Sequence, residues 1–266
     1  MNNRPIGVFD SGVGGLTVVK ELIRQLPNEN IVYFGDTARV PYGVKSKPTI
    51  IRFSTESILF LLKKKVKLIC VACNTASSLA LPSIKGHFNI PLLGVIAPGA
   101  EKASSLSKTR RIGVIGTRAT INSRSYEKEL KRIDPKIKVF TQACALFVPF
   151  VEEAWLNKKP LEDVARVYLE PLKRKKIDTL ILGCTHYPLL KKLIKKIMGP
   201  KVILVDSAKE TVKQLRELLI NKGCLRQAMK KAKKIFYVTD EKSSFFDLGK
   251  SFLDNDSIKV MKVNNV

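Results

Sequence analysis

Two stretches of the sequence decide its fold, LICVACNT at residues 68–75 and LILGCTH at residues 180–186. Each is a short apolar run with β-branched residues that reaches a cysteine and then turns polar, which predicts a buried strand running into a loop. Each is preceded, at a similar distance, by a strand-like segment that opens with Ile-Gly-Val, at residues 6–8 and 112–114. The repetition predicts two similar halves, each with a cysteine at the end of a strand.

Strand-like runs alternate with amphipathic helical patterns along nearly the whole chain. Such alternation predicts an α/β fold with mainly parallel sheets that helices cover on both faces. Ligands of such sheets bind beyond the carboxyl ends of the strands, so two pseudosymmetric α/β domains would form an active-site cleft between them. The predicted strands are Ile6–Asp10, Ile31–Phe34, Lys67–Ala72, Leu92–Ile96, Arg111–Gly116, Lys138–Thr141, Thr179–Gly183, Val202–Val205, Ile235–Val238 and Ile258–Met261. The predicted helices include Gly15–Gln25, Ile51–Lys64, Leu161–Lys175, Leu189–Lys196 and Ala208–Asn221.

The composition is that of a globular enzyme, with 45% hydrophobic and 27% charged residues in 266. No apolar run approaches the ~20 residues that a membrane-spanning helix needs, and the first residues lack the apolar stretch of a signal peptide. We therefore expect a cytoplasmic protein without a membrane partner. Five cysteines, an odd number, do not make a disulfide framework in a chain of this length.

The net charge of +25 is the most unusual bulk property. A charge of this sign attracts polyanions and speeds encounters with anionic small molecules, but it says nothing about fold. The lysine runs lie mostly in or beside predicted helices, so solvated helix faces explain them most simply. Non-specific binding to nucleic acid remains open, although no aromatic stacking platform or nucleic-acid motif supports it as the main function.

Cys73 and Cys184 could act together as acid and base. Inverting an α-carbon requires removing a proton from one face and delivering one to the other, which two groups on opposite sides can do. A thiol suits this role, since its pKa of about 8.5 can be lowered by a helix N-terminus or a cation. Both cysteines precede a predicted helix start, where the dipole favours a thiolate. The alternative is that they are small buried apolar residues, but the matched pair with polar neighbours favours chemistry.

The first predicted strand leads into the loop DSGVGG at residues 10–15. It is not a dinucleotide fingerprint, because the third glycine of G-x-G-x-x-G would fall on Thr17. We expect exposed backbone N–H groups at a helix N-terminus, which suit a carboxylate. Asp10 could orient an ammonium group or tune proton transfer; alternatively, it caps the helix.

Other cysteine and histidine patterns carry less weight. Cys70 and Cys73 form a C-x-x-C pair, but residues three apart on a strand point to opposite faces and should not bridge. No second pair or histidine cluster completes a zinc site. His186 follows Cys184 by two residues and could pair with its thiolate or with a substrate carboxylate, whereas His87 is predicted to be a surface residue.

Seven motifs follow one another along the chain: DSGVGGLTV at 10–18, GDTARVPYG at 35–43, ACNTAS at 72–77, GVIAPGA at 94–100, IGVIGT at 112–117, GCTHYPLL at 183–190 and VDSA at 205–208. In this order they resemble the motifs of the glutamate racemase family. The resemblance covers the chain from Ile6 to about Asn221. Aspartate racemases share the two-cysteine plan but lack the segment that contains GDTA and PYG.

This resemblance implies interconversion of L- and D-glutamate without pyridoxal phosphate, metal or nucleotide, with D-glutamate feeding bacterial peptidoglycan. Cys73 would act on the D-enantiomer and Cys184 on the L-enantiomer, with Asp10 and His186 assisting them. It also implies one domain formed by residues 1–97 and 208–266 and a second formed by residues 98–207. The residues that match substrate-contacting positions are Asp10, Ser11, Tyr42, Gly43, Asn74, Thr75, Thr185 and His186, with Thr117, Thr120 and Glu152 in less distinctive segments.

Two departures from the family pattern lie near Glu152. Ala145 stands where proline is expected and Ala154 where glycine is common, so the local loop geometry there is in question. A pyridoxal-dependent racemase is a rival interpretation, because the many lysines could include a Schiff-base lysine. The sequence also leaves open a homodimer.

Overall fold

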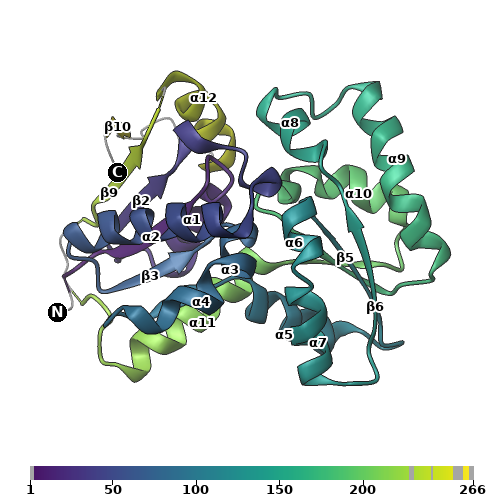
Figure 1. Cartoon of the computed structure of the whole chain (residues 1–266), viewed down its shortest axis with the longest axis horizontal. Coiled ribbons are helices and arrows are strands. Elements are labelled where there is room, and N and C mark those ends of the chain that lie inside the picture. The colour runs from purple at the N-terminus through teal and green to yellow at the C-terminus, as the bar shows by residue number, and fades with distance from the viewer. Residues whose placement is uncertain (1–2, 228–230, 241, 254–259, 264–266) are drawn as a thin grey trace.

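A computed structural model describes residues 3–227, 231–240, 242–253 and 260–263 and contains two parallel sheets (Figure 1). The larger sheet has the strand order β10-β9-β2-β1-β3-β4 and the smaller one β6-β5-β7-β8. Every pairing between the described strands is parallel. The strands are β1 (Ile6–Asp10), β2 (Ile31–Gly35), β3 (Leu68–Val71), β4 (Leu92–Gly94), β5 (Arg111–Gly116), β6 (Lys138–Ala143), β7 (Thr179–Gly183), β8 (Ile203–Asp206), β9 (Lys234–Val238) and β10 (Val260–Lys262).

The two sheets repeat one topology. The order β2-β1-β3-β4 in the larger sheet matches the order β6-β5-β7-β8 in the smaller one. In each, the strand that opens with Ile-Gly-Val lies inside the sheet and pairs with the strand that leads to the cysteine. The predicted α/β fold with two similar halves is therefore confirmed.

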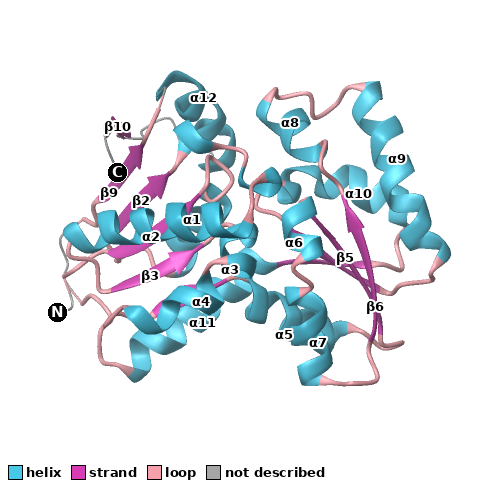
Figure 2. Cartoon of the chain, in the orientation of Figure 1, coloured by secondary structure: helices cyan, strands magenta, loops and turns pink. Residues whose placement is uncertain are grey.

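Helices lie on both faces of the larger sheet (Figure 2). One core contains Val8 and Cys70 with residues of α1, α11 and α12, and the opposite core contains Phe9 and Val71 with residues of α2, α3 and α4. Cys70 and Cys73 belong to different cores and are free thiols, which confirms that they do not bridge. The α-helices are α1 (Leu16–Gln25), α2 (Lys47–Lys63), α3 (Asn74–Leu79), α4 (Leu81–Ile84), α5 (Ile96–Leu106), α6 (Arg118–Asn122), α7 (Ser125–Ile133), α8 (Phe147–Glu152), α9 (Lys159–Arg174), α10 (Lys191–Met198), α11 (Ser207–Asn221) and α12 (Lys242–Leu253). In the described part of the chain, none of them is both long and apolar enough to cross a membrane.

Two predicted boundaries are wrong for local reasons. The strand predicted to reach Ile96 ends at Gly94, because Val95 has helical backbone angles and donates its N–H to the Ser77 hydroxyl. Helix α2 begins before Ile51, at Lys47, because the Ser46 side chain accepts the N–H of Thr49 as an N-cap.

The chain passes between the sheets twice, from β4 through α5 to β5 and from β8 through α11 to β9. We propose domain boundaries close to these passages, with residues 1–97 and 208–266 in one domain and residues 98–207 in the other. Both termini of the described chain then belong to the domain with the larger sheet. The predicted strand Ile258–Met261 lies partly outside the described residues, and β10 forms over Val260–Lys262.

Leu180 tests the packing of the smaller sheet, because its side chain is fully buried. Replacing Leu180 with alanine should lower the free energy of unfolding by about 2–5 kcal/mol, since the removed methyl groups leave a cavity. Leu59→Ala is the matched control, because Leu59 is 46% exposed, and it should change stability by about 0.5 kcal/mol or less. Urea denaturation followed by circular dichroism measures both; equal losses would contradict this account of the core.

Candidate active site

A cleft of about 410 Å³ lies where the carboxyl ends of β3 and β7 meet. Loops from both halves of the molecule line it, and both Cys73 and Cys184 are in its wall. Of the other residues predicted from the sequence, Ser11, Tyr42, Gly43, Asn74, Thr75, Thr117, Glu152, Thr185 and His186 line the cleft. The strand-end cysteines thus share one cavity, as the matched halves predicted.

Cys73 is the N-cap residue of α3 and is 5% exposed. Its thiol donates to the Ser11 hydroxyl over 3.6 Å. Burial and the neighbouring Asp10 carboxylate raise the pKa of Cys73 to about 12, although the amide of Ala76 and the Ser11 hydroxyl oppose the rise. The expected net lowering of this pKa is therefore not found: the first turn of α3 opposes the rise through the Ala76 amide, but it does not compensate for the loss of solvation.

Cys184 has a different neighbourhood. The helix predicted from Leu189 begins at Lys191, after a 3-10 turn over Tyr187–Leu190, so the expectation that an α-helix N-terminus adjoins Cys184 is wrong. The side chain that approaches the Cys184 sulfur is His186, whose Nδ1 lies 3.7 Å from it. The thiol, one of the two partners predicted for His186, therefore lies beside its ring.

His186 lies between Cys184 and Glu152, and its Nε2 is 3.1 Å from the Glu152 carboxylate. Burial alone would lower the pKa of His186, but hydrogen bonds to Cys184 and Glu152, together with their charges, raise it to about 10. Glu152 ends helix α8. Two residues later Ala154 has φ +55°, a conformation that favours glycine, so the departure from the family pattern falls on a strained position.

Asp10 lies beneath the cleft and is fully buried. Its carboxylate accepts the N–H of Gly12 over 3.0 Å and faces the Thr185 hydroxyl at 3.5 Å. Burial raises the pKa of Asp10, while the charge of His186 and the amides of Gly12 and Gly15 oppose the rise. Asp10 therefore binds a loop amide and feels the charge of His186. It does not cap α1, whose N-cap is Gly15 without a side-chain hydrogen bond, so the capping interpretation is wrong.

The glycine loop at residues 12–15 is buried, so the prediction of exposed amides there is wrong. It packs against the other half of the molecule: a Cβ on Gly14 would lie 2.3 Å from the Thr185 hydroxyl and 2.7 Å from the His186 ring. Gly43 makes a similar approach, with its Cβ position 2.7 Å from Thr117. Only glycine lets the two halves come this close at these points.

Three threonines join the halves beside the cleft. The hydroxyls of Thr75 and Thr117 are 3.0 Å apart, and Thr120 lies 3.3 Å from Thr75 and 3.0 Å from Thr117. Thr120 is buried behind the other two rather than in the cleft wall. Thr117 also caps α6, because its side chain accepts the N–H of Thr120.

The sequence interpretation missed part of the cleft wall. Arg118 brings a positive charge to the wall, and Leu146 and Pro149 bring apolar surface. The only sequence signal that Arg118 lines the cleft was its position next to Thr117. This signal is weak, because exposed arginines at helix starts are common for reasons unrelated to a binding site.

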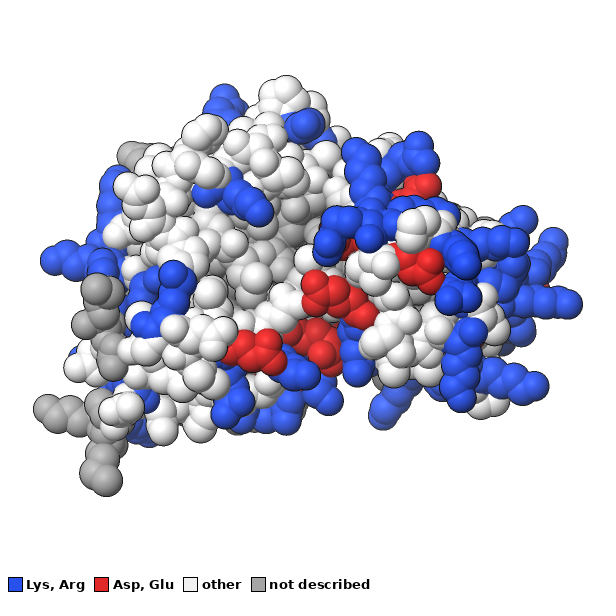
Figure 3. All heavy atoms as spheres, turned by 90° about the horizontal axis from the view of Figure 1, so that it is seen from below, with Lys and Arg blue, Asp and Glu red and all other residues white. Residues whose placement is uncertain are grey.

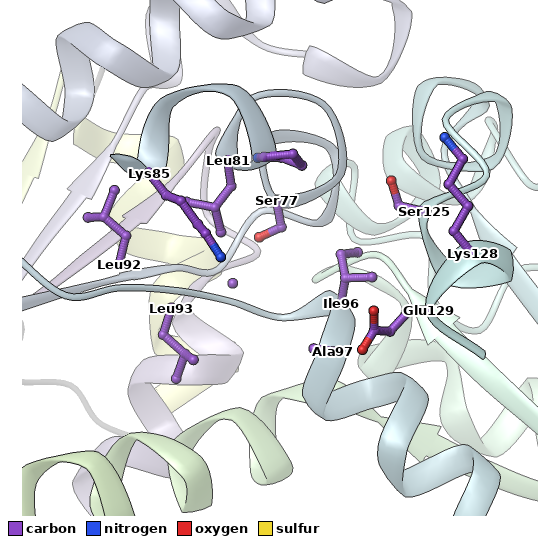
Figure 4. Close-up of a pocket in the computed structure, with 12 residues that line it drawn as sticks. Ser77, Leu81, Lys85, Leu92, Leu93, Ile96, Ala97, Ser125, Lys128 and Glu129 are labelled. Atoms are coloured by element: carbon purple, nitrogen blue, oxygen red, sulfur yellow. The ribbon is translucent and has the colours of Figure 1, made fainter. Parts of the chain in front are cut away.

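A second pocket, of about 390 Å³, lies between α4 and α7 (Figure 4). Leu81, Lys85 and Leu92 face Ser125, Lys128 and Glu129 across it. Its walls contain no cysteine or histidine. The cleft is therefore the better candidate for acid/base chemistry.

Two matched α/β halves with one thiol each in a shared cleft have the architecture of a two-domain racemase. Residues 6–215 match the family model described as Asp/Glu/Hydantoin racemase, and the chain belongs to that family. It is 48% identical to glutamate racemase of Geobacter metallireducens over 94% of this chain and 93% of that protein.

Solved structures agree over the whole chain. A glutamate racemase isoform from Bacillus anthracis matches with a TM-score of 0.96 and 42% identity, covering 99% of this chain and 98% of that one. The glutamate racemase of Francisella tularensis in complex with D-glutamate matches with a TM-score of 0.93, at the same identity and coverage.

The raised pKa of His186 gives a prediction for pH. His186 should remain an imidazolium until the pH approaches 10. Since its folded pKa exceeds the ordinary 6.5, its protonation stabilises the fold fully below about pH 6.5, and this contribution is lost as the pH rises through the folded pKa.

NMR of ¹³C-histidine-labelled protein measures this titration directly. The chain has two histidines, so the variant His87→Gln leaves only the His186 signal. Glu152→Gln should lower the midpoint, because it removes the carboxylate that stabilises the imidazolium. A midpoint near 6.5 in the unmodified site would contradict the described hydrogen bonds.

Proposed function

We propose that this protein is a glutamate racemase that interconverts L- and D-glutamate with Cys73 and Cys184 as its two acid/base groups. The pair of strand-end thiols in one cleft is the observation that carries the proposal. The likeness to glutamate racemases over nearly the full chain supports glutamate as the substrate. We further propose that its D-glutamate supplies cytoplasmic peptidoglycan synthesis.

In the L-to-D direction, the Cys184 thiolate takes the α-proton of L-glutamate. The electron pair of the broken C–H bond stays on the α-carbon, and the Cys73 thiol delivers its own proton to the opposite face. The reaction leaves Cys184 protonated and Cys73 as a thiolate, and the D-to-L direction reverses each step. The raised pKa of Cys73 suits a group that must hold a proton until the carbanion forms.

The surroundings of the thiols supply the remaining roles. The imidazolium of His186 stabilises the Cys184 thiolate, and Glu152 keeps His186 protonated, while the charge of His186 favours the ionised form of Asp10. Hydroxyl and amide groups in the cleft wall suit the carboxylates of glutamate, and the charge of Arg118 attracts this anion. The polar wall groups proposed to bind substrate are Ser11, Tyr42, Gly43, Asn74, Thr75, Thr117 and Thr185, with Thr120 supporting them.

Turnover in heavy water tests the two-base mechanism. L-glutamate should give D-glutamate with deuterium at the α-carbon, because the delivering thiol has exchanged with solvent. The remaining L-glutamate should gain little deuterium at early times. Cys184 removes its proton, and Cys73, which carries the deuterium, delivers only to the opposite face of the α-carbon. Chiral chromatography with mass spectrometry measures both enantiomers in protein dialysed against a chelator.

Cys73→Ala and Cys184→Ala should each abolish racemisation, because either change leaves one face of the α-carbon without its acid/base group. Cys224→Ala is the matched control, since this half-buried thiol lies outside the cleft, and it should retain full activity. Full racemisation by either cleft variant, or activity that is lost with the chelator and returns with a metal, would refute the mechanism.

We also infer a weak, non-specific affinity for polyanions. Lys and Arg side chains crowd the surface of the half that contains the smaller sheet (Figure 3). In this half the run Lys173–Lys176 lies at the end of α9 and the run Lys191–Lys196 lies in α10. Binding to duplex DNA, measured by fluorescence anisotropy, should be independent of sequence and fall steeply between 50 and 200 mM salt, by about 10³ or more if six phosphates are neutralised. Sequence-dependent binding that survives physiological salt would contradict this inference.

The association of two copies of this chain into a homodimer stays a prediction.

A further inference from the structure

Tyr126 is a buried side chain that reaches the neighbours of both cysteines. It is the second residue of α7 and is 3% exposed. Its ring lies beside Gly99 and Gly183: a Cβ on Gly183 would be 3.1 Å from ring atom Cε2, and one on Gly99 would be 3.3 Å from Cε1. Since Gly183 directly precedes Cys184, the ring packs against the strand end that presents this thiol.

The hydroxyl of Tyr126 reaches the other half of the site. It donates to the side-chain Oδ1 of Asn74 over 2.7 Å, and Asn74 directly follows Cys73. Ser207, where the chain returns toward the larger sheet, lies beside the Tyr126 ring, since a Cβ on Gly99 would be 3.1 Å from the Ser207 Cβ and 3.3 Å from Tyr126 Cε1. One side chain therefore contacts the residue beside each thiol and one of the two passages between the sheets.

The hydrogen bond fixes which end of the Asn74 amide faces the cleft. An asparagine side chain has one acceptor oxygen and one NH₂ group with two donors. Because Oδ1 accepts from Tyr126, the NH₂ group is left for the cleft, whose wall includes Asn74. Among the described residues, no hydrogen bond is seen for this NH₂ group. A flipped amide would instead present its carbonyl oxygen, which repels a carboxylate.

Ser125, the neighbour of Tyr126, also connects α7 to α3. The Ser125 hydroxyl donates to the carbonyl oxygen of Ser78 over 3.0 Å, so the start of α7 is tied to α3 at a second point. Ser125 and Ser77 both line the second pocket (Figure 4). The position of Tyr126 relative to Asn74 is therefore held by two hydrogen bonds rather than one.

We propose that Tyr126 is a positioning residue of the reaction, which holds the Asn74 amide with its N–H donors toward the substrate carboxylate and sets the spacing of the two cysteine loops. This inference rests on the proposed function for its substrate. It assigns two separable roles to the Tyr126 side chain. The hydroxyl controls substrate binding, and the ring controls the placement of the thiols.

The variant Tyr126→Phe removes the hydroxyl and keeps the ring. The KM for glutamate should rise by about 3- to 10-fold, the effect of one neutral hydrogen bond, while kcat changes by less than about threefold. Tyr237→Phe is the matched control, because Tyr237 is a buried tyrosine of β9 outside the cleft; its KM should be unchanged.

A double-mutant cycle separates positioning from a general structural effect. If the hydroxyl acts through Asn74, Tyr126→Phe should raise KM by less than about twofold when Asn74 is already alanine. Additive effects of the two substitutions, or a fall in kcat without a rise in KM, would overturn the role assigned to the hydroxyl.

Thiol alkylation tests the ring without relying on turnover. In Tyr126→Leu, iodoacetamide should modify both Cys73 and Cys184 at least about threefold faster than in the unmodified protein, because both loops lose a common support. Peptide mass spectrometry follows each thiol, with buried Cys144 as the internal reference. Faster modification of one thiol alone, or of neither, would overturn the role of the ring. Absence of glutamate turnover in the unmodified protein would instead refute the proposed function, and the alkylation result would still decide the role of Tyr126.

Discussion

The parallel pairing of β1 with β3 and of β5 with β7 is the constraint on which the site depends. In a parallel sheet all strands end at the same edge, so the register that places Ile6 opposite Leu68 also brings Asp10 and Cys73 to one side of the molecule. The corresponding register, Ile112 opposite Thr179, brings Thr117 and Cys184 to the same edge of the second sheet. Two sheets whose carboxyl ends face one cleft then present polar loops to each other while their strands remain buried.

Close approach of the halves turns two loops into one site. Gly14 and Gly43 let backbone meet side chains of the other half at distances that a Cβ would forbid. The approach buries Asp10 and His186, whose charges would be costly without partners. Each therefore has two: Asp10 accepts a loop amide and feels the charge of His186, and His186 bridges the Cys184 sulfur and the Glu152 carboxylate.

The sequence alone was sufficient to predict the elements with strong patterns. Nine of the ten strands in the described residues were expected close to where they lie, and β10 overlaps a predicted strand that lies partly outside them. The central strands had the clearest signal, since buried parallel strands are continuous apolar runs. The features it could not predict depend on contacts distant in the chain. The end of β4 is set by a hydrogen bond from Val95 to Ser77, and the pKa of Cys73 by burial that no local pattern encodes. Tyr126 was overlooked because its partners, Asn74 and Gly183, are far from it in sequence.

The fold is nearly symmetric, but the electrostatics of the two thiols are not. Cys73 has a hydroxyl partner and a raised pKa, whereas Cys184 has a charged histidine whose protonation Glu152 supports. For a racemase this asymmetry cannot favour one product, because enantiomers have equal free energies in water and a catalyst does not change an equilibrium. The ratio kcat/KM must then be the same in both directions. Any difference between the thiols has to appear as matched changes in kcat and KM, so the unequal surroundings affect how tightly each enantiomer is held and how fast it reacts, but not which one accumulates.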